Sequence, residues 1–286
     1  MRDPLRIPGV VNELLATWEA VPDLSLAQLW ALLEARGVAL NSLDEEVVDA
    51  LRAVRSRHPS SVSFSSLVDD ATSPPSPVLV EVEGPDRRVT LAPRTVPGNS
   101  SGGANEVELW AIVRGQRTMP AGVFRRGVRR GARAEDSGEV SGGVRRAMEG
   151  DAGQLVSSQP GLWRVGEVKR CRAGAPLVLV DESGVPHRLG VVKRLTIVGA
   201  GEQSLTGTRR EELEGRVFVA RLAQDAGTVV IGSIVECYLA ERRELRTSTL
   251  RWSQLVAAGE GEDLRVRGLD GQVHVLGRVE TLLRAE

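Results

Sequence analysis

The side chains best suited to acid–base or metal chemistry in this chain are its three histidines, His58, His187 and His274. His187 and His274 occupy equivalent places in two stretches that align without a gap, LVLVDESGVPHRLGVVKRL (177–195) and LRVRGLDGQVHVLGRVETL (264–282). A metal site needs several His, Cys or carboxylate ligands around one ion, and no HxH, CxxC or HExxH spacing occurs. We therefore expect these two histidines to share a structural role, such as bonding the backbone of their own hairpins.

Two further patterns have the outline of catalytic or cofactor motifs. GAGEQS (199–204) follows an expected strand, but Ser204 stands where a dinucleotide-binding turn needs its third glycine. NSSGG (99–103) follows His58 and Asp69 or Asp70 in the order of a serine protease, with too few residues between to build two barrels around a triad. We interpret both as loops, and we expect no catalytic residue, no cofactor and no metal. An enzyme whose site is assembled from scattered carboxylates and arginines stays open as an alternative.

The densest cationic feature is the segment FRRGVRRGAR (124–133), and we take its arginines as the candidate binding residues. These are Arg125, Arg126, Arg129, Arg130 and Arg133. Such segments bind nucleic-acid backbones through salt-sensitive phosphate contacts. The alternatives are a solvated linker, or an arm docked on a partner or on the acidic N-terminal region, where residues 1–76 have 6 Arg against 11 Asp and Glu, a net charge of −5.

Residues 1–58 are predicted to form a small helical domain. Val10, Val11, Leu14, Leu15 and Trp18 fall at helical spacing on one face. Ser25 with Gln28 and Ser42 with Glu45 have capping-box spacing, and Gly37 is placed to end the second of three helices. A helix-turn-helix reader of DNA is disfavoured by the acidic charge, so we expect this unit to dock on another protein.

The middle of the chain is predicted to be a linker (59–77), a first β element (78–114) and a flexible Gly/Ser/Arg-rich segment (115–160). The β element contains a hairpin over 78–91 that turns at Gly84–Pro85–Asp86, and a strand over 107–113. Val82, Asp86 and Leu91 match the spacing of Val180, Gly184 and Leu189, so the hairpin is a candidate third copy of the duplicated one.

The C-terminal part is predicted to be β-rich, with one module over 161–200 and a second over 201–286. Each contains one copy of the duplicated hairpin. In the second module we expect a short helix around Thr208–Leu213, strands over 216–222 and 228–239, and a helix near Ser248–Ala258. Small barrels would cover the apolar faces of both hairpins, which are marginal in isolation.

Residues 162–198 resemble SH3-like or Tudor-like small barrels. The resemblance rests on Trp163 before a strand, Asp181 and Gly184 in a tight hairpin, and Leu195 in a final strand. It covers about 40 residues per copy and implies a fold rather than a ligand. The aromatic cage by which many Tudor domains bind methylated side chains is not visible, which puts that activity in doubt.

Composition sets the remaining expectations. The net charge of −1 gives no global attraction to nucleic acid or membranes. Cys171 and Cys237 are the only cysteines, and we read neither a signal peptide nor a span long enough to cross a bilayer. We predict a cytoplasmic, multidomain α+β protein of a bacterial type, acting as a non-enzymatic adaptor subunit of a larger assembly. A nucleic-acid-binding or regulatory role through Arg125–Arg133 is the alternative, and the oligomeric state is left open.

Overall fold

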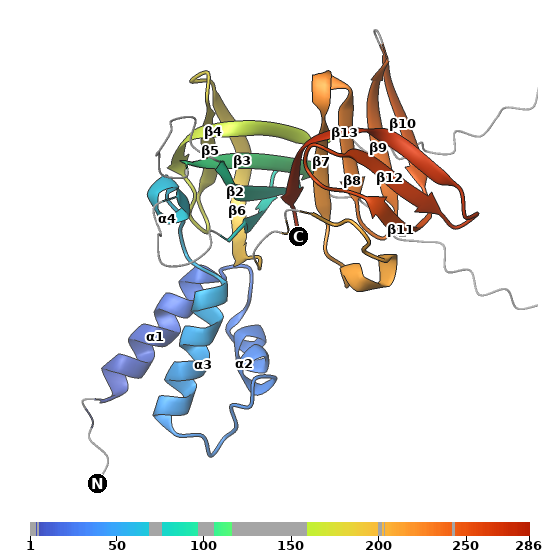
Figure 1. Ribbon diagram of the computed structural model, residues 1–286. Helices are drawn as coiled ribbons and strands as arrows, with labels where there is room; N and C mark the ends of the chain where they lie inside the picture. The colour runs from blue at the N-terminus through green and yellow to red at the C-terminus, as the bar shows by residue number, and fades with distance from the viewer. Residues whose placement is uncertain are drawn as a thin grey trace, which may run out of the picture. The chain divides into compact units, whose positions relative to one another are not determined.

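The computed structural model describes residues 4, 6–68, 76–96, 106–115, 159–199, 202, 204–241 and 244–286 (Figure 1). Most of the predicted flexible segment 115–160 lies outside these residues, and so do all five arginines of the candidate binding segment. The described part is a mixed α+β structure with a few helices and two curled antiparallel sheets. None of its helices is long and apolar enough to cross a membrane.

Three helices lie where the sequence predicts them, namely α1 (Arg6–Ala20), α2 (Leu26–Glu34) and α3 (Asp44–Arg57). The capping box at the start of α2 is confirmed, because Ser25 and Gln28 each accept a hydrogen bond from the other's backbone N–H. One cluster of buried side chains among these helices consists of Leu33, Val38, Leu51 and Val54. That the helices form a domain of their own stays a prediction.

The start of α3 differs from the prediction by one residue. The cap residue is Leu43, whose N–H donates to the Glu46 carboxylate (2.9 Å). The hydroxyl of Ser42 instead accepts a hydrogen bond from the N–H of Ala39 (3.0 Å) and closes the preceding turn. The predicted pairing of Ser42 with Glu45 is therefore wrong, because the Ser42 hydroxyl is bonded in the turn before α3.

The predicted linker 59–77 contains ordered structure. The short helix α4 (Phe64–Val68) lies within it, and Ser61 forms an isolated β-bridge with Arg172. The side chain of Leu67 is buried in the core of the first sheet. Residues 61–68 thus pack against the first sheet.

Six strands close into a first barrel, because β1 pairs with both β2 and β6. They are β1 (Val78–Glu83), β2 (Arg87–Val96), β3 (Glu106–Gly115), β4 (Gly161–Arg170), β5 (Pro176–Asp181) and β6 (Pro186–Ile197). The alternation of β1 shows how the core is filled, since Val78, Val80 and Val82 are buried. Residues 78–114 and 161–200, expected as separate elements, therefore build one barrel.

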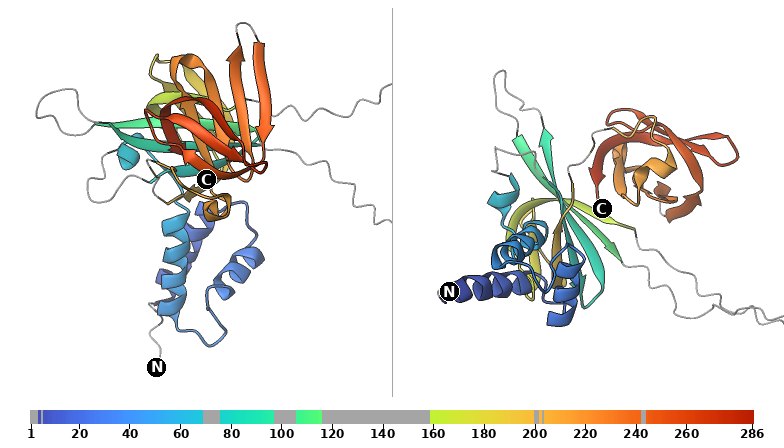
Figure 2. Two further views of the ribbon diagram at one scale, coloured as in Figure 1. Left: turned by 45° about the vertical axis from the view of Figure 1, so that its right-hand side comes forward. Right: turned by 90° about the horizontal axis from the view of Figure 1, so that it is seen from below.

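The remaining strands form a second curled sheet in the order β10-β9-β8-β7-β13-β12-β11. They are β7 (Phe218–Leu222), β8 (Gly227–Ile231), β9 (Val235–Glu241), β10 (Glu244–Leu250), β11 (Trp252–Ala257), β12 (Asp263–Gly268) and β13 (Val273–Arg284). Two 3₁₀ turns, η1 (Arg210–Leu213) and η2 (Ala223–Asp225), accompany them. The curl of this sheet is visible in the right-hand view of Figure 2.

Two sequence predictions fail in this sheet. The helix expected near Ser248–Ala258 is absent, and β10 and β11 occupy those residues. The strand expected over 228–239 is two strands, because the chain reverses at Gly232, whose N–H donates to the carbonyl of Ile234 (3.1 Å).

The duplicated hairpin is confirmed as a structural repeat. In β5–β6 Leu177 pairs with Gly190, in β12–β13 Leu264 pairs with Gly277, and a β-bulge follows at the same step in both. The two glycines have φ values of +121° and +132°, a region that side chains with a Cβ rarely adopt.

The repeat extends well beyond the hairpin. The pairing of Val165 with Asp181 in β4–β5 recurs 87 residues later as Trp252 with Gly268 in β11–β12. The register of β1–β2 recurs in β7–β8, and that of β1–β6 recurs in β7–β13 with the bulge conserved in place. Because only Arg251 separates β10 from β11, these two strands together correspond to β4. The second curled sheet thus repeats the strand order of the first barrel.

This correspondence overturns the interpretation of 78–91 as a third copy of the hairpin. Its counterpart is β7–β8, where Phe218 pairs with Ile231 as Val78 pairs with Leu91. Even the bridge between Ser61 and Arg172 has a partner in that between Ser204 and Gly259. The repeated unit is therefore the whole six-stranded pattern, together with the segment before its first strand that carries the bridge.

Candidate functional site

The described residues contain no cluster of three or more His, Cys, Asp or Glu side chains that could hold a metal ion. The three histidines lie apart and have different partners. His58, which ends α3, points its Nδ1 at the carbonyl of Leu195 and the hydroxyl of Thr196, both at 3.1 Å. It therefore ties the end of α3 to β6, and burial lowers its pKa.

His187 is held by the turn of its own hairpin. Its Nε2 donates to the Asp181 carboxylate (2.8 Å), and its ring lies 4.7 Å from that of Trp163. The Ser183 hydroxyl, His187 and the N–H of Val185 all donate to Asp181 and hold its pKa well below the usual range. Because Ser183 donates to the carboxylate rather than to the imidazole, the trio does not have the proton-transfer order of a catalytic triad.

His274 occupies the equivalent place without the equivalent bond. Gly268 stands where the first copy has Asp181, and the carboxylate sits two residues later as Asp270, which accepts from the N–H of Gln272 (3.0 Å). The Nε2 of His274 is buried and has no hydrogen-bond partner among the described residues. His187 therefore bonds to a carboxylate of its own hairpin, whereas His274 forms no such bond, so the two histidines do not share the expected role.

The other sequence candidates do not converge on these histidines. Ser101, Asp69 and Asp70 lie outside the described residues. Ser204 of the GAGEQS stretch forms the bridge to Gly259, which fits the interpretation as a loop. Cys171 and Cys237 are buried and free, and burial raises the pKa of Cys171 to about 12, so neither is an activated thiol.

The feature that sequence reasoning missed is an exposed apolar row on α1, here called the α1 stripe. It consists of Ile7, Val11, Leu15 and Trp18, which are exposed by 53%, 54%, 54% and 36%. The sequence places Val10, Leu14 and three of these residues on one core face, but only the part toward Thr17 and Ala20 turns inward. The sequence signal for it is the width of the apolar arc of α1, because that arc is wider than a single packing partner covers.

The stripe is fixed at its C-terminal end and belongs to a helical region of net negative charge. The indole Nε1 of Trp18 donates to the carbonyl of Leu24 (2.7 Å), which fixes the ring. Residues 6–58 hold 5 Arg against 8 Asp and Glu, a net charge of −3. Leu26 and Trp30 of α2, the next helix along the chain, are also exposed, by 45% and 37%.

A groove of about 850 Å³ lies on the other side of α1, between α1 and α3. Its walls include Val10, Ala16 and Val48. The carboxylate of Glu13 sits within it and forms ion pairs with Arg52 (3.2 Å) and Arg55 (3.0 Å). Because Glu13 and the two arginines pair with one another, they are less available to bind a charged ligand in the groove.

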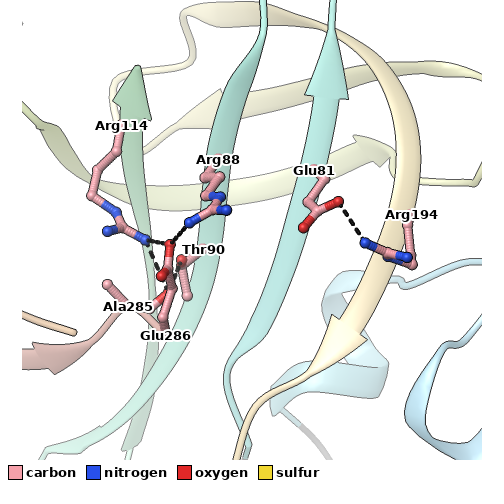
Figure 3. Close-up of polar contacts among 7 residues, drawn as sticks. All are labelled: Glu81, Arg88, Thr90, Arg114, Arg194, Ala285 and Glu286. Carbon is pink, nitrogen blue, oxygen red and sulfur yellow. Dashed lines mark hydrogen bonds and ion pairs between the residues drawn. The ribbon is translucent and has the colours of Figure 1, made fainter. Parts of the chain in front are cut away.

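A polar cluster joins the first barrel to residues 285–286 (Figure 3). The carboxylate of Glu286 pairs with Arg88 (2.8 Å) and Arg114, and the hydroxyl of Thr90 donates to the carbonyl of Ala285 (2.7 Å). Burial lowers the pKa of Arg114 although Glu286 opposes that shift. The cluster is closed by the chain itself, so we assign it a structural role.

No protein-family model, curated protein or solved structure matches this chain.

Proposed function

We propose that this protein is a non-enzymatic adaptor that docks on another protein through the α1 stripe. The observation that carries the proposal is the row of four large apolar side chains left exposed on one helix. An apolar row of this kind marks an interaction surface more often than a catalytic one.

The two β units support the same proposal as scaffolds. Their repeated strand order gives rigid frames with few open edges. We include in the proposal the finer expectations of an N-terminal three-helix domain, small barrels of SH3-like or Tudor-like kind, and a cytoplasmic location. Membership of a larger bacterial assembly completes it.

Co-purification from the native host tests the proposal. A tagged full-length chain is compared with the V11E/L15E double variant, and captured proteins are identified by mass spectrometry. We expect at least one near-stoichiometric partner that the variant loses, since charge on an apolar docking face removes binding. A chain that runs alone and turns over a metabolite would contradict the adaptor role.

A second candidate function rests on the five arginines within nine residues at Arg125–Arg133. It predicts nucleic-acid binding that weakens steeply with salt, because each phosphate contact releases counterions. Replacing Arg125, Arg126, Arg129 and Arg130 by Gln should abolish that binding in an anisotropy titration. Unchanged binding by the quadruple variant would eliminate this role.

A further inference from the structure

The α1 stripe has the dimensions of a helix-docking row. Ile7, Val11, Leu15 and Trp18 follow at intervals of four, four and three residues, which keeps them on one side of the helix. At 1.5 Å per residue the row is about 16 Å long. A straight apolar row of this length matches the ridge of a second helix of about three turns, as in helix–helix packing.

Charge selects the kind of helix. Glu19 is exposed, follows Trp18 directly, and has no ion-pair partner among the described residues. Glu19 lies four residues after Leu15 and so continues the spacing of the row at the end where Trp18 stands. A carboxylate and an indole face at that end each attract a cation, by ion pairing and by cation–π attraction. The net charge of −3 over residues 6–58 acts in the same direction.

We propose that the α1 stripe receives an amphipathic helix of another protein, whose apolar residues are flanked by Lys or Arg. This inference rests on the adaptor function proposed above and adds the chemistry of the partner. Its apolar side chains pack between Ile7, Val11 and Leu15, and a cation at one end lies against Trp18 and Glu19. Because Trp18 is already fixed by its bond to Leu24, little side-chain freedom is lost at that anchor on binding.

A second copy of the chain fits the stripe less well. Pairing two α1 helices through their stripes would bring two regions of net charge −3 together, and like charges across an interface oppose association. A cationic partner turns the same charge into attraction. Charge thus favours a different, basic protein over self-association.

The test uses the full chain and two synthetic peptides. Each peptide has 16 residues and leucines at i, i+4, i+8 and i+11; one carries Lys on its flanks and the other carries Glu at the same positions. In fluorescence anisotropy we expect the basic peptide to bind at least ~10-fold more tightly than the acidic one, because only it complements Glu19 and the acidic helices. E19K should shrink that preference several-fold.

Three controls keep the test decisive. V11E/L15E should weaken the basic peptide at least ~10-fold, since it places charge in the apolar row. V275E alters a side chain on β13 that is 60% exposed and should leave binding unchanged. Circular dichroism checks that α1 stays helical, which is expected because glutamate is a good helix former.

The outcomes separate the partner's chemistry from the adaptor role. Equal binding of both peptides, insensitive to E19K but lost in V11E/L15E, overturns the cationic partner and leaves the stripe as a docking face. Binding unaffected by V11E/L15E overturns the stripe as a site and removes the main support for the adaptor role. A dimer in sedimentation velocity that V11E/L15E dissociates would show that a second copy is the occupant.

Discussion

At the scale of single residues, the two copies of the hairpin share a backbone but differ in the hydrogen bonds that their aspartates form. Asp181 binds both a backbone N–H and His187, whereas Asp270 keeps the backbone bond and leaves His274 without a partner. The gap-free alignment already places Gly268 opposite Asp181, but only the structure shows that the Nε2 of His274 is left without a partner among the described residues.

Exchanging these residues should restore the missing bond. The double variant G268D/D270S gives the second copy the Asp and Ser of the first, and we expect it to stabilise the protein by about 1 kcal/mol because a buried Nε2 gains an acceptor. Urea denaturation measures the change. G268D alone should destabilise, since its Cβ would displace the Asp270 carboxylate from its bond with the N–H of Gln272 and place a second carboxylate beside it. A double variant no more stable than that single one would contradict the equivalence.

His58 should make the contact between α3 and β6 sensitive to acid. Its folded pKa lies below the value of 6.5 because burial disfavours the charged ring, a shift reinforced by Arg194, Arg57 and Arg36 and opposed by the bond to Leu195. As pH falls from 7 through 6.5, the unfolded chain takes up a proton that the folded chain resists, so stability falls.

The measurement is the free energy of unfolding between pH 7.5 and 5, for the wild type and H58N. The asparagine amide can still donate to the Leu195 carbonyl but does not titrate, so the variant should lose less stability across this window. The other two histidines are present in both proteins and cancel in the comparison. Parallel curves would show that His58 does not titrate in the contact.

At the scale of elements, β-bulges explain where prediction succeeds and fails. Bulges at Trp252/Gln254 and Leu255/Ala257 each insert one residue, so the buried residues are Trp252 and Leu255 of β11 and Ala258 directly after it. A spacing of three imitates the inward face of a helix, which is why Ser248–Ala258 reads as one. In β1, by contrast, buried and more exposed residues alternate regularly, and its hairpin with β2 is predicted correctly.

The α1 stripe escapes prediction for a related reason. Periodicity finds Val11, Leu15 and Trp18 on an apolar face together with Val10 and Leu14. It cannot say that α3 and the core cover only one half of that face, because the partner helices are set by tertiary packing. Exposure within an apolar arc is therefore the part of the site that only the structure supplies.

The bulge glycine of each hairpin should be intolerant of any side chain. In Gly190 a Cβ would lie 2.5 Å from the carbonyl oxygen of Glu83, and φ is +121°. We expect G190A to lose at least ~2 kcal/mol, from backbone strain together with that collision. G184A is the matched control, with φ of +87° and open space around its Cβ, and should lose about 1 kcal/mol. Equal losses in a denaturation series would contradict the steric argument.

At the scale of the whole molecule, an apolar cluster joins the first barrel to the second curled sheet. Trp110 and Ile112 of β3 belong to it, and so do Val219, Tyr238 and Leu283. Glu286 adds its pairs with Arg88 and Arg114 beside this cluster. The two β units should therefore unfold together rather than one after the other.

Removing the charge of Glu286 should weaken that coupling. E286Q leaves Arg114, whose side chain is only 15% exposed, without a counter-charge, and we expect a loss of about 1–2 kcal/mol. Calorimetry should show a broadened or divided unfolding transition. D225N removes the exposed ion pair with Arg221 and should leave the transition unchanged. A single sharp transition in E286Q at the wild-type temperature would contradict the coupling.

The repeated register also says where the chain accepts extra sequence. Ala111 pairs with Trp163 across β3 and β4 as Val235 pairs with Leu250 across β9 and β10. Residues 116–160 connect the first two strands, whereas two residues connect the second two. One hairpin tip thus already carries some forty residues while its barrel stays closed. We expect a guest domain grafted between Glu241 and Glu244 to be carried equally well, making that tip a handle for labels and reporters.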